Sequence, residues 1–396
     1  MARLPVFNRH RHIFAYELVF KNGTSNLFPG IDKAAPPSKL LSSSFFTVGI
    51  EQLASGHKAV VNFSRDMLLQ GIPAKFSARS TVVMLLDDVR PDEEVLDACR
   101  LLVHHGYMLA LDKFVYTEDS ISLLELVKII RVDFLHNSSE QIIELVGIAK
   151  KYQCKLFADK IDTYADYNRA YNQDFVYFQG SFFTKPENLL NKQISSSQMI
   201  YMQLIMEVNR AEFQIKKLES LLKQDAVISY KLLKYLNSAT YSRLQPLSSI
   251  RQAIAFLGER GTRMFISLIA TSSLTEGKPD ELIRLSCVRA RFLELIGKEL
   301  HQDHGLFFLL GLFSLLDAIL DAPMKSLIKQ LPVAQDINQA LVHDAGPLFP
   351  FLHLIKLYEA GQWRELESVM AQLNMDGTKI MNYYLDALRW SEYFIG

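Results

Sequence analysis

The chain has 396 residues, which at about 150 residues per domain predicts two or three domains and excludes a single small module. Hydrophobic residues make up 49% and charged residues 22%, as in ordinary globular proteins, so the composition excludes a disordered or fibrous chain. The 43 Lys and Arg residues balance 43 Asp and Glu residues, and a formally neutral chain has no broad positive field for nonspecific nucleic-acid binding.

The three cysteines, Cys99, Cys154 and Cys287, are widely spaced and odd in number, which is typical of a reducing compartment rather than of a disulfide framework. We therefore expect a cytoplasmic protein. The first residues contain no apolar segment of the signal-peptide kind. The longest apolar stretch, residues 305–316, is shorter than the roughly 20 residues that span a bilayer, so we expect no membrane contact.

Up to about residue 190, short apolar runs alternate with helix-like stretches, a pattern of repeated βα units. Several runs are almost continuously hydrophobic, which favours parallel strands buried on both faces inside a ring of helices. We expect a TIM-like barrel, with the polar residues 8–12 at the tip of a hairpin. The predicted strands are residues 13–20, 58–64, 81–87, 107–112, 129–134, 155–159 and 176–179.

The pattern changes near residues 191–197, where small polar residues interrupt it. Afterwards apolar residues recur at helical spacing, as in Leu218, Leu221 and Leu222, and glycines such as Gly258 punctuate the predicted helices. The sequence therefore predicts an α/β domain at residues 1–192 and an all-α domain at residues 198–396.

Polar side chains lie at the predicted carboxyl ends of the strands, where the active sites of parallel barrels are found. One such residue is usually a turn former, but a series on successive strands indicates a site, present or ancestral. These residues are Glu17, Asn62, Asp87, Asp88, Asp112, Lys113, Arg131, Asp133, Asp159 and Gln179.

The first half resembles EAL domains, which hydrolyse cyclic di-GMP, in its segments 15–18, 61–64, 111–112, 158–163 and 178–180. The second half resembles the HDOD domain in its segments 223–226, 232–238 and 249–258. Together the two resemblances cover nearly the whole chain. They imply an EAL barrel followed by a helical HDOD domain, as in bacterial EAL–HDOD signalling proteins.

In active EAL domains, oxygen ligands hold two Mg²⁺ or Mn²⁺ ions that activate a water molecule. The resemblance implies that four ligand positions are retained here, at Glu17, Asn62, Asp112 and Gln179. Arg131 and Asp159 replace a lysine and a glutamate of the family and keep their charge. Two changes are severe: Met84 replaces a metal-binding glutamate, and Lys113 replaces the second of two paired aspartates.

A thioether is a poor ligand for a hard cation, and a lysine ammonium in the cage would repel metal ions. We therefore expect a degenerate, catalytically inactive EAL domain that needs no cofactor. Its vestigial pocket would consist of Glu17, Asn62, Met84, Asp112, Lys113, Arg131, Asp159 and Gln179. The protein would act as a regulator or scaffold that contacts protein partners through the HDOD domain, near cyclic di-GMP control of motility.

Two alternatives stay open. In the first, the Lys113 ammonium takes the place of a metal ion and holds a phosphate, which makes the barrel a metal-independent cyclic di-GMP receptor. In the second, the barrel is a weak phosphodiesterase with one Mg²⁺ or Mn²⁺ ion. That ion would be held by Glu17, Asn62, Asp112 and Asp159, with help from Asp87 or Asp88.

Overall fold

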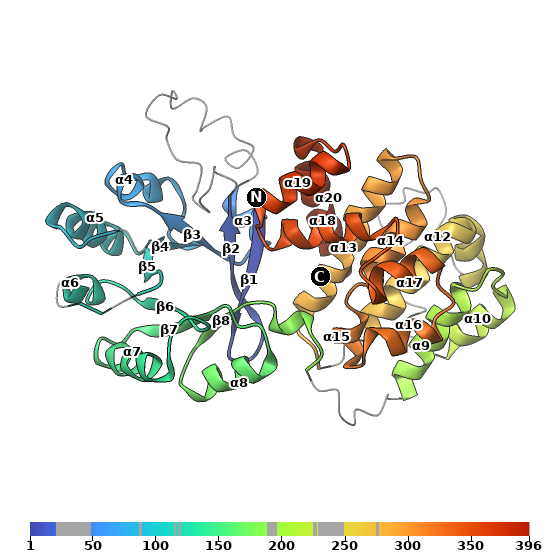
Figure 1. Cartoon of the computed structure of the whole chain (residues 1–396), viewed down its shortest axis with the longest axis horizontal. Coiled ribbons are helices and arrows are strands. Elements are labelled where there is room, and N and C mark those ends of the chain that lie inside the picture. Colours follow the sequence, from blue (N-terminus) through green and yellow to red (C-terminus); the bar gives the residue numbers. More distant parts are fainter. Residues whose placement is uncertain are drawn as a thin grey trace. The chain divides into compact units, whose positions relative to one another are not determined.

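The structure is a computed structural model that divides into two compact units. It describes residues 1–20, 49–86, 89–114, 116–117, 120–187, 196–224, 228, 249–274 and 277–395 (Figure 1). The first unit comprises Met1–Phe182 with Leu357–Leu366, and the second comprises Phe183–Lys356 with Glu367–Gly396.

The first unit is a closed barrel of eight strands in chain order, which confirms the predicted barrel (Figure 1). All seven predicted strands are present, and an eighth precedes them. The strands are β1 (Ala2–Asn8), β2 (Ile13–Val19), β3 (Lys58–Phe63), β4 (Thr81–Leu85), β5 (Met108–Leu111), β6 (Ile129–Asp133), β7 (Lys155–Asp159) and β8 (Tyr177–Gln179).

One strand of the barrel is antiparallel to its neighbours, as the predicted hairpin at residues 8–12 requires. β1 runs antiparallel to both β2 and β8, while the remaining pairs are parallel. The reason is the short connection from Asn8 to Ile13, because only antiparallel strands can be joined by so few residues. The Asn8 Oδ1 accepts bonds from the backbone N–H groups of His10 (2.9 Å) and His12 (3.1 Å), so the predicted hairpin tip is confirmed.

Helices and short helical turns connect the parallel strands. Three of the longer helices have side-chain N-caps, where Asp92, Ser138 and Thr163 accept bonds from backbone N–H groups in the first turn. Ser138 and Gln141 form a complete capping box. The elements are α3 (Ile50–Leu53), α4 (Arg65–Leu69), η1 (Ile72–Lys75), α5 (Glu93–His104), α6 (Ile121–Leu124), α7 (Ser139–Lys151) and α8 (Tyr164–Asn172), with η3 (Phe182–Thr184) after β8.

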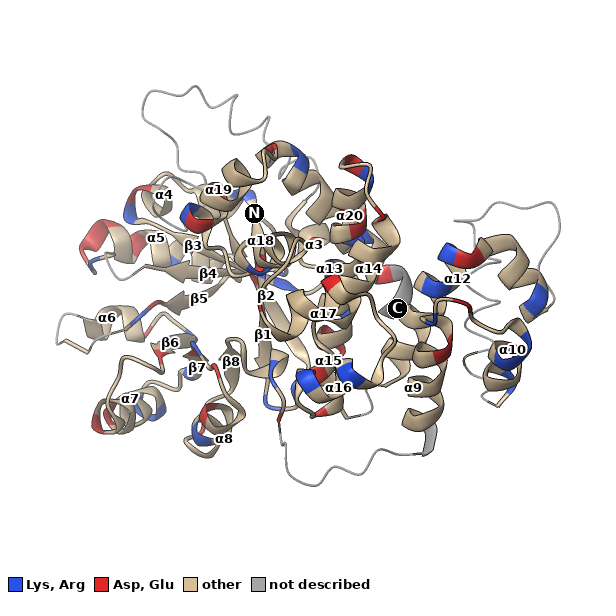
Figure 2. Cartoon of the chain, turned by 45° about the vertical axis from the view of Figure 1, so that its right-hand side comes forward, with Lys and Arg blue, Asp and Glu red and all other residues tan. Residues whose placement is uncertain are grey.

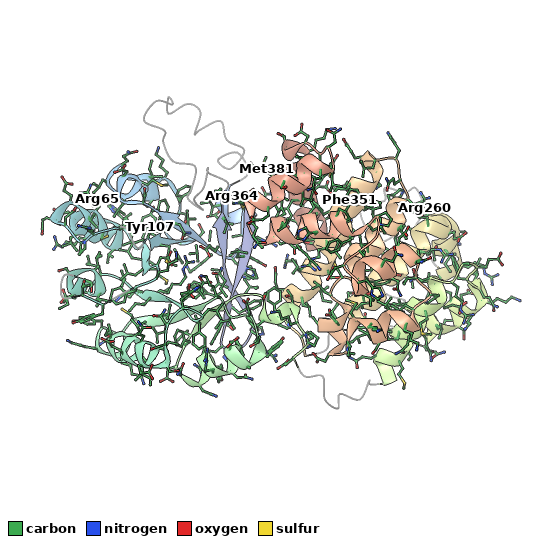
Figure 3. The ribbon with its side chains drawn as sticks, in the orientation of Figure 1. Arg65, Tyr107, Arg260, Phe351, Arg364 and Met381 are labelled. Atoms are coloured by element: carbon green, nitrogen blue, oxygen red, sulfur yellow. The ribbon has the colours of Figure 1, made fainter. Side chains whose placement is uncertain are left out.

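Charged residues of both signs are interspersed on these outer helices (Figure 2). Arg65 lies at the start of α4 (Figure 3). It pairs with Asp92 and Glu94 at the start of α5, both at 2.7 Å. These pairs are solvent-exposed and contribute little to stability. The mixture of charges agrees with the neutral balance of the sequence.

Inward-pointing side chains fill the barrel interior, because alternate residues of each strand face inward. They form one apolar cluster that closes the centre of the barrel. Its fully buried members are Val6, Ala15, Val60, Val82, Met84, Ala110, Ile129, Phe157 and Tyr177.

The second unit is helical, and after β8 no strand occurs among the described residues, which confirms the predicted all-α region. The predicted stripe Leu218, Leu221 and Leu222 is buried. The helices that follow β8 are α9 (Ser196–Val208), α10 (Ile215–Lys223), α12 (Ile250–Ser273), α13 (Asp280–Glu299), α14 (His304–Phe313), α15 (Leu316–Leu320), α16 (Met324–Gln330), α17 (Gln335–Val342), α18 (Phe349–Glu359), α19 (Trp363–Gln372) and α20 (Gly377–Ile395). The end of α18 and the start of α19 belong to the first unit. The HDOD-like segment 232–238 lies outside the described residues.

Two glycines explain local features of these helices. Gly258 has a φ of 66° and kinks α12, at the position where the sequence predicts a break. Gly311 of α14 lies against α13, where an added Cβ would come within 2.4 Å of the Arg289 carbonyl oxygen. Only glycine permits so close an approach. Within the described part of the chain, no helix is both long and apolar enough to cross a membrane.

Candidate functional site

A polar layer lies next to the apolar cluster, at the carboxyl ends of the strands. Each of its residues follows an inward-facing cluster residue by two positions, as Glu17 follows Ala15 and Arg131 follows Ile129, so it faces the same side. We call this set the polar layer: Glu17, Asn62, Asp112, Arg131, Asp159 and Gln179. All but Asp159, which is partly exposed, are buried.

Arg131 holds the polar layer together. Its Nη1 donates to Glu17 Oε1 at 2.9 Å, and its Nε donates to Asp112 Oδ1 at 2.7 Å. Asn62 Nδ2 donates to the same Glu17 oxygen at 2.9 Å. Burial disfavours the charged guanidinium, but the charges of Glu17 and Asp112 outweigh burial and hold the pKa of Arg131 well above its usual range.

Three polar atoms of the layer have no hydrogen-bond partner among the described residues. Asn62 Oδ1 and Gln179 Nε2 are buried without partners. Arg131 Nη2 also lacks a hydrogen bond to a described residue, whereas Nη1 and Nε of the same guanidinium donate to Glu17 and Asp112. Buried polar groups are normally paired, and an unpaired one calls for an explanation such as a catalytic role, a bound ion or water. The layer therefore offers one acceptor and two donors to a ligand or to water.

Asp159 is the acid of this layer whose titration is displaced toward neutrality. Burial raises its pKa from 3.8 to about 6, and the charges of Glu17 and Asp112 add to the rise, while Arg131 opposes it. A carboxyl group of this kind is largely ionised at pH 7 and still basic enough to accept a proton. Such displacement is typical of general acids and bases.

Two predicted pocket residues are not among the polar groups of this layer. Met84 follows Val82 by two positions and pairs in register with Asn62, so it borders the layer, and it is fully buried in the apolar cluster. Lys113 follows Asp112 with a φ of 42°, and its side chain is exposed and forms no ion pair with any described residue. The side chain therefore points away from the polar layer, because the chain turns after Asp112. The buried cation of the layer is Arg131.

A second polar group lies at the carboxyl end of β6, and the sequence analysis missed two of its members. Asp133 Oδ2 accepts bonds from Lys160 Nζ at 2.6 Å and pairs with His136 Nδ1 at 2.9 Å. Burial raises the pKa of Asp133, but these two bonds lower it more, so the pKa is lowered overall. Lys160 directly follows Asp159 and His136 follows Asp133 by three residues, a spacing that would have identified both.

The polar layer does not fit a pair of divalent ions. Arg131 bonds to both Glu17 and Asp112, the carboxylates that would have to bridge such ions. No group of three His, Cys, Asp or Glu side chains among the described residues has the arrangement of a metal site. Asp87 and Asp88, which the sequence analysis considered as ligands, lie outside the described residues.

Comparisons with known proteins give one family model and two relatives that match over nearly the whole chain. Residues 194–322 match the model of the HDOD domain. The chain is 32% identical, over 99% of its length and 92% of the relative, to the cyclic di-GMP phosphodiesterase CdgJ of Vibrio cholerae. It is 30% identical, over 98% of its length and 97% of the relative, to the protein YuxH of Bacillus subtilis.

Solved structures give weaker likenesses. An EAL-domain protein of Listeria monocytogenes is 15% identical with a TM-score of 0.36, covering 46% of this chain and 85% of that one. The EAL-domain protein YkuI of Bacillus subtilis, solved with cyclic di-GMP and calcium, is 17% identical with a TM-score of 0.36, covering 64% and 71%. Scores this low do not establish a common fold.

The fold and the family match define a barrel protein that carries a helical HDOD domain. The chain belongs to the family of CdgJ and YuxH, and this relationship links it to cyclic di-GMP signalling.

The prediction that the chain is not an enzyme is wrong, because a relative matching nearly its whole length is named a phosphodiesterase. That prediction rested on Met84 and on an ammonium of Lys113 in the pocket; Met84 is buried in the apolar cluster, and the Lys113 side chain is exposed.

Proposed function

We propose that this chain is a cyclic di-GMP phosphodiesterase that binds its substrate at the polar layer. The observation that carries the proposal is the buried layer of three carboxyl groups around Arg131, at the end of the barrel where parallel strands place active sites. The relationship to the Vibrio phosphodiesterase supports the choice of substrate.

In this proposal Arg131 and Gln179 bind the phosphate groups of the substrate. Arg131 Nη2 and Gln179 Nε2 are the donors without partners, and guanidinium and amide N–H groups suit the anionic oxygens of a phosphodiester. Arg131 stays charged at every working pH, since its pKa is held well above the usual range. We assign it the stabilisation of the charge that develops on phosphorus oxygens during hydrolysis.

Asp159 is the proton acceptor in this proposal. Water adds to phosphorus, the bond from phosphorus to one ribose oxygen breaks, Asp159 takes the water proton, and the leaving oxygen takes a proton from solvent. A pKa of about 6 leaves the carboxylate available at pH 7. The product is the linear dinucleotide.

The proposal includes no resident metal ion. Arg131 takes the central position between Glu17 and Asp112 and supplies positive charge there. The earlier receptor hypothesis gave such a role to Lys113, and Arg131 replaces it. We further propose that the HDOD domain contacts protein partners and that the chain works in the cytoplasm, in line with its three free cysteines.

The test is an incubation of the full chain with cyclic di-GMP, once in Mn²⁺ and once in EDTA. Chromatography then measures how much linear dinucleotide has formed. We expect linear dinucleotide in both, at a rate proportional to protein, and a loss of about 100-fold or more in Asp159→Asn. The exposed Arg100→Met is the matched control and should keep full activity. Absence of product in both media contradicts the phosphodiesterase, and product in Mn²⁺ alone contradicts its independence of metal.

A further inference from the structure

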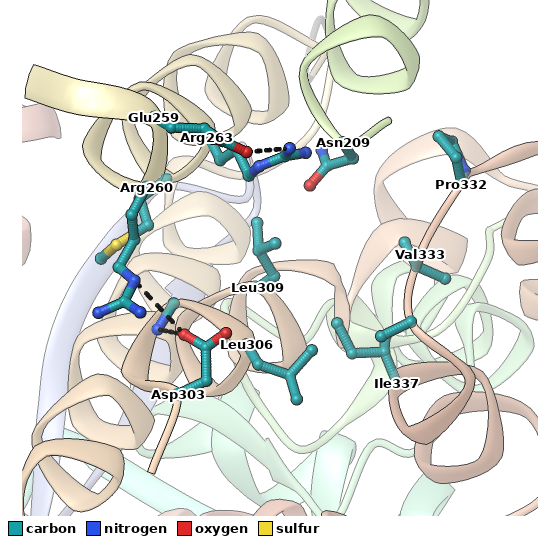
Figure 4. Close-up of a pocket in the computed structure, with 13 residues that line it drawn as sticks. Asn209, Glu259, Arg260, Arg263, Asp303, Leu306, Leu309, Pro332, Val333 and Ile337 are labelled. Atoms are coloured by element: carbon teal, nitrogen blue, oxygen red, sulfur yellow. Dashed lines mark hydrogen bonds and ion pairs between the residues drawn. The ribbon is translucent and has the colours of Figure 1, made fainter. Parts of the chain in front are cut away.

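The helical unit contains a pocket of about 420 Å³, a size within the range of small-molecule sites (Figure 4). Residues of α12, α14 and α17 line it, together with Asn209, which follows α9. All of these residues belong to the second unit. The pocket is therefore separate from the polar layer of the barrel.

Asn209 presents one unused hydrogen-bond acceptor to this pocket. The residue is only 8% exposed. Its Nδ2 donates to the Ile205 carbonyl at 2.8 Å and to Ser267 Oγ at 2.9 Å, which fixes the orientation of the amide. The opposite atom, Oδ1, points into the pocket and has no partner among the described residues (Figure 4).

Arg263 holds the backbone around Asn209 in place. Its Nη1 donates to the Val208 carbonyl at 2.7 Å, and its Nη2 donates to the Ala211 carbonyl at 2.8 Å and to Glu259 Oε1 at 2.6 Å. These bonds use the guanidinium for structure and leave little of it for a ligand. The acceptor at Asn209 is therefore preorganised.

One wall of the pocket is apolar, and the charged residues at its rim are paired with one another. Leu306, Leu309, Val333 and Ile337 extend into the open space opposite Asn209 (Figure 4). At the rim, Arg260 Nε lies 3.6 Å from Asp303 Oδ1, and Glu259 is paired with Arg263. No unpaired charge among the lining residues favours an ion, so the pocket suits an uncharged ligand.

From this geometry we infer that the pocket binds a flat apolar group with one N–H or O–H donor, the chemistry of an indole or a phenol. The ring packs against the apolar wall, and its donor bonds to Asn209 Oδ1. The group has two possible sources, a free small molecule or a Trp or Tyr side chain of a protein partner. This inference does not depend on the proposed barrel chemistry.

The probes are indole and 1-methylindole, which differ by the single donor, added to the full chain and followed by calorimetry or ligand-observed NMR. We expect indole to bind with a Kd of about 1 mM, an affinity typical of so small a ligand. We expect 1-methylindole to bind about fivefold or more weakly, since it leaves a buried acceptor unpaired.

A pair of variants locates the binding. Leu306→Trp fills the pocket and should abolish indole binding, whereas Leu101→Trp, on exposed α5 of the barrel, should leave it unchanged. The peptide Ala-Ala-Trp-Ala-Ala distinguishes the sources: tighter binding than indole assigns a partner side chain, and weaker binding assigns a free ligand. Three results would overturn the inference. They are equal binding of the two indoles, no binding of indole at about 10 mM, which is ten times the expected Kd, and indole binding that persists in Leu306→Trp.

Discussion

At the scale of single residues, the direction of a side chain decides the chemistry of the barrel. Asp112 and Lys113 are neighbours in sequence, yet Asp112 is buried in the polar layer and Lys113 is exposed. The sequence shows that an acidic and a basic residue are adjacent. It does not show that Lys113 has a φ of 42°, which turns the chain at the end of the strand. The polar layer itself was predictable, because its residues follow inward-facing positions by two.

Arg131 should be essential to the stability of the barrel. Arg131→Met leaves Glu17 and Asp112 buried without their counter-ion, and we expect the free energy of unfolding to fall by about 3–5 kcal/mol. Chemical denaturation measures this change. Arg100→Met removes exposed pairs to Glu93 and Asp97 and should cost less than about 1 kcal/mol. An equal loss of unfolding free energy in the two variants would show that the buried ion pairs of Arg131 stabilise the fold no more than exposed pairs do.

Asp159 should make stability depend on pH in a defined direction. Its pKa is higher in the folded chain, about 6, than the ordinary 3.8, so the folded state binds the proton more tightly. The free energy of unfolding therefore falls as the pH rises from 3.8 to about 6, because the group ionises less readily in the folded state. The loss is about 3 kcal/mol, and it persists at higher pH. Asp159→Asn should be more stable than the parent at pH 7 and equal to it near pH 3.

Urea denaturation at several pH values measures this effect. Asp174→Asn is the control, because Asp174 is exposed and pairs with Lys150, which lowers its pKa. That variant should not gain stability at pH 7. A parent protein and an Asp159→Asn variant with parallel stability curves from pH 3 to 7 would contradict the displaced titration.

At the scale of helices and strands, the apolar runs predicted seven strands and the helical half. The sequence analysis missed β1, whose residues Arg3 and Pro5 interrupt the apolar pattern and are unusual within a strand. Arg3 is accommodated because its guanidinium donates to Ser55 Oγ at 2.7 Å and lies over the Tyr16 ring. These partners are distant in sequence, which is why local pattern could not predict them.

Substitution of two helix glycines by alanine should change the stability of the protein in opposite directions. Gly311→Ala places a methyl group against the Arg289 backbone and should separate α13 from α14, at a cost of about 1–3 kcal/mol. Gly147→Ala lies in α7 with open space around the new methyl and should add about 0.5–1 kcal/mol, since alanine favours a helix. Thermal unfolding of both variants checks the contrast, and stabilisation by Gly311→Ala would refute the close helix contact.

At the scale of the whole molecule, the chain joins a barrel with a buried polar layer to a helical HDOD domain that contains a pocket. Hydrophobic patterning and motifs were sufficient to predict both folds. They were not sufficient to predict activity, because substitutions at Met84 and Lys113 were judged without knowing where those side chains lie. The pocket at Asn209 depends on tertiary packing of several helices and left no local signal.

The most direct measurement is the rate of linear dinucleotide formation from cyclic di-GMP by the full chain between pH 5 and 8, in EDTA. We expect a rate that rises through about pH 6, as Asp159 ionises, and then levels off. The Asp159→Asn variant should show no such rise. Absence of product across the whole range, or a rate independent of both pH and Asp159, would contradict the assignment of the polar layer as the site that acts on cyclic di-GMP.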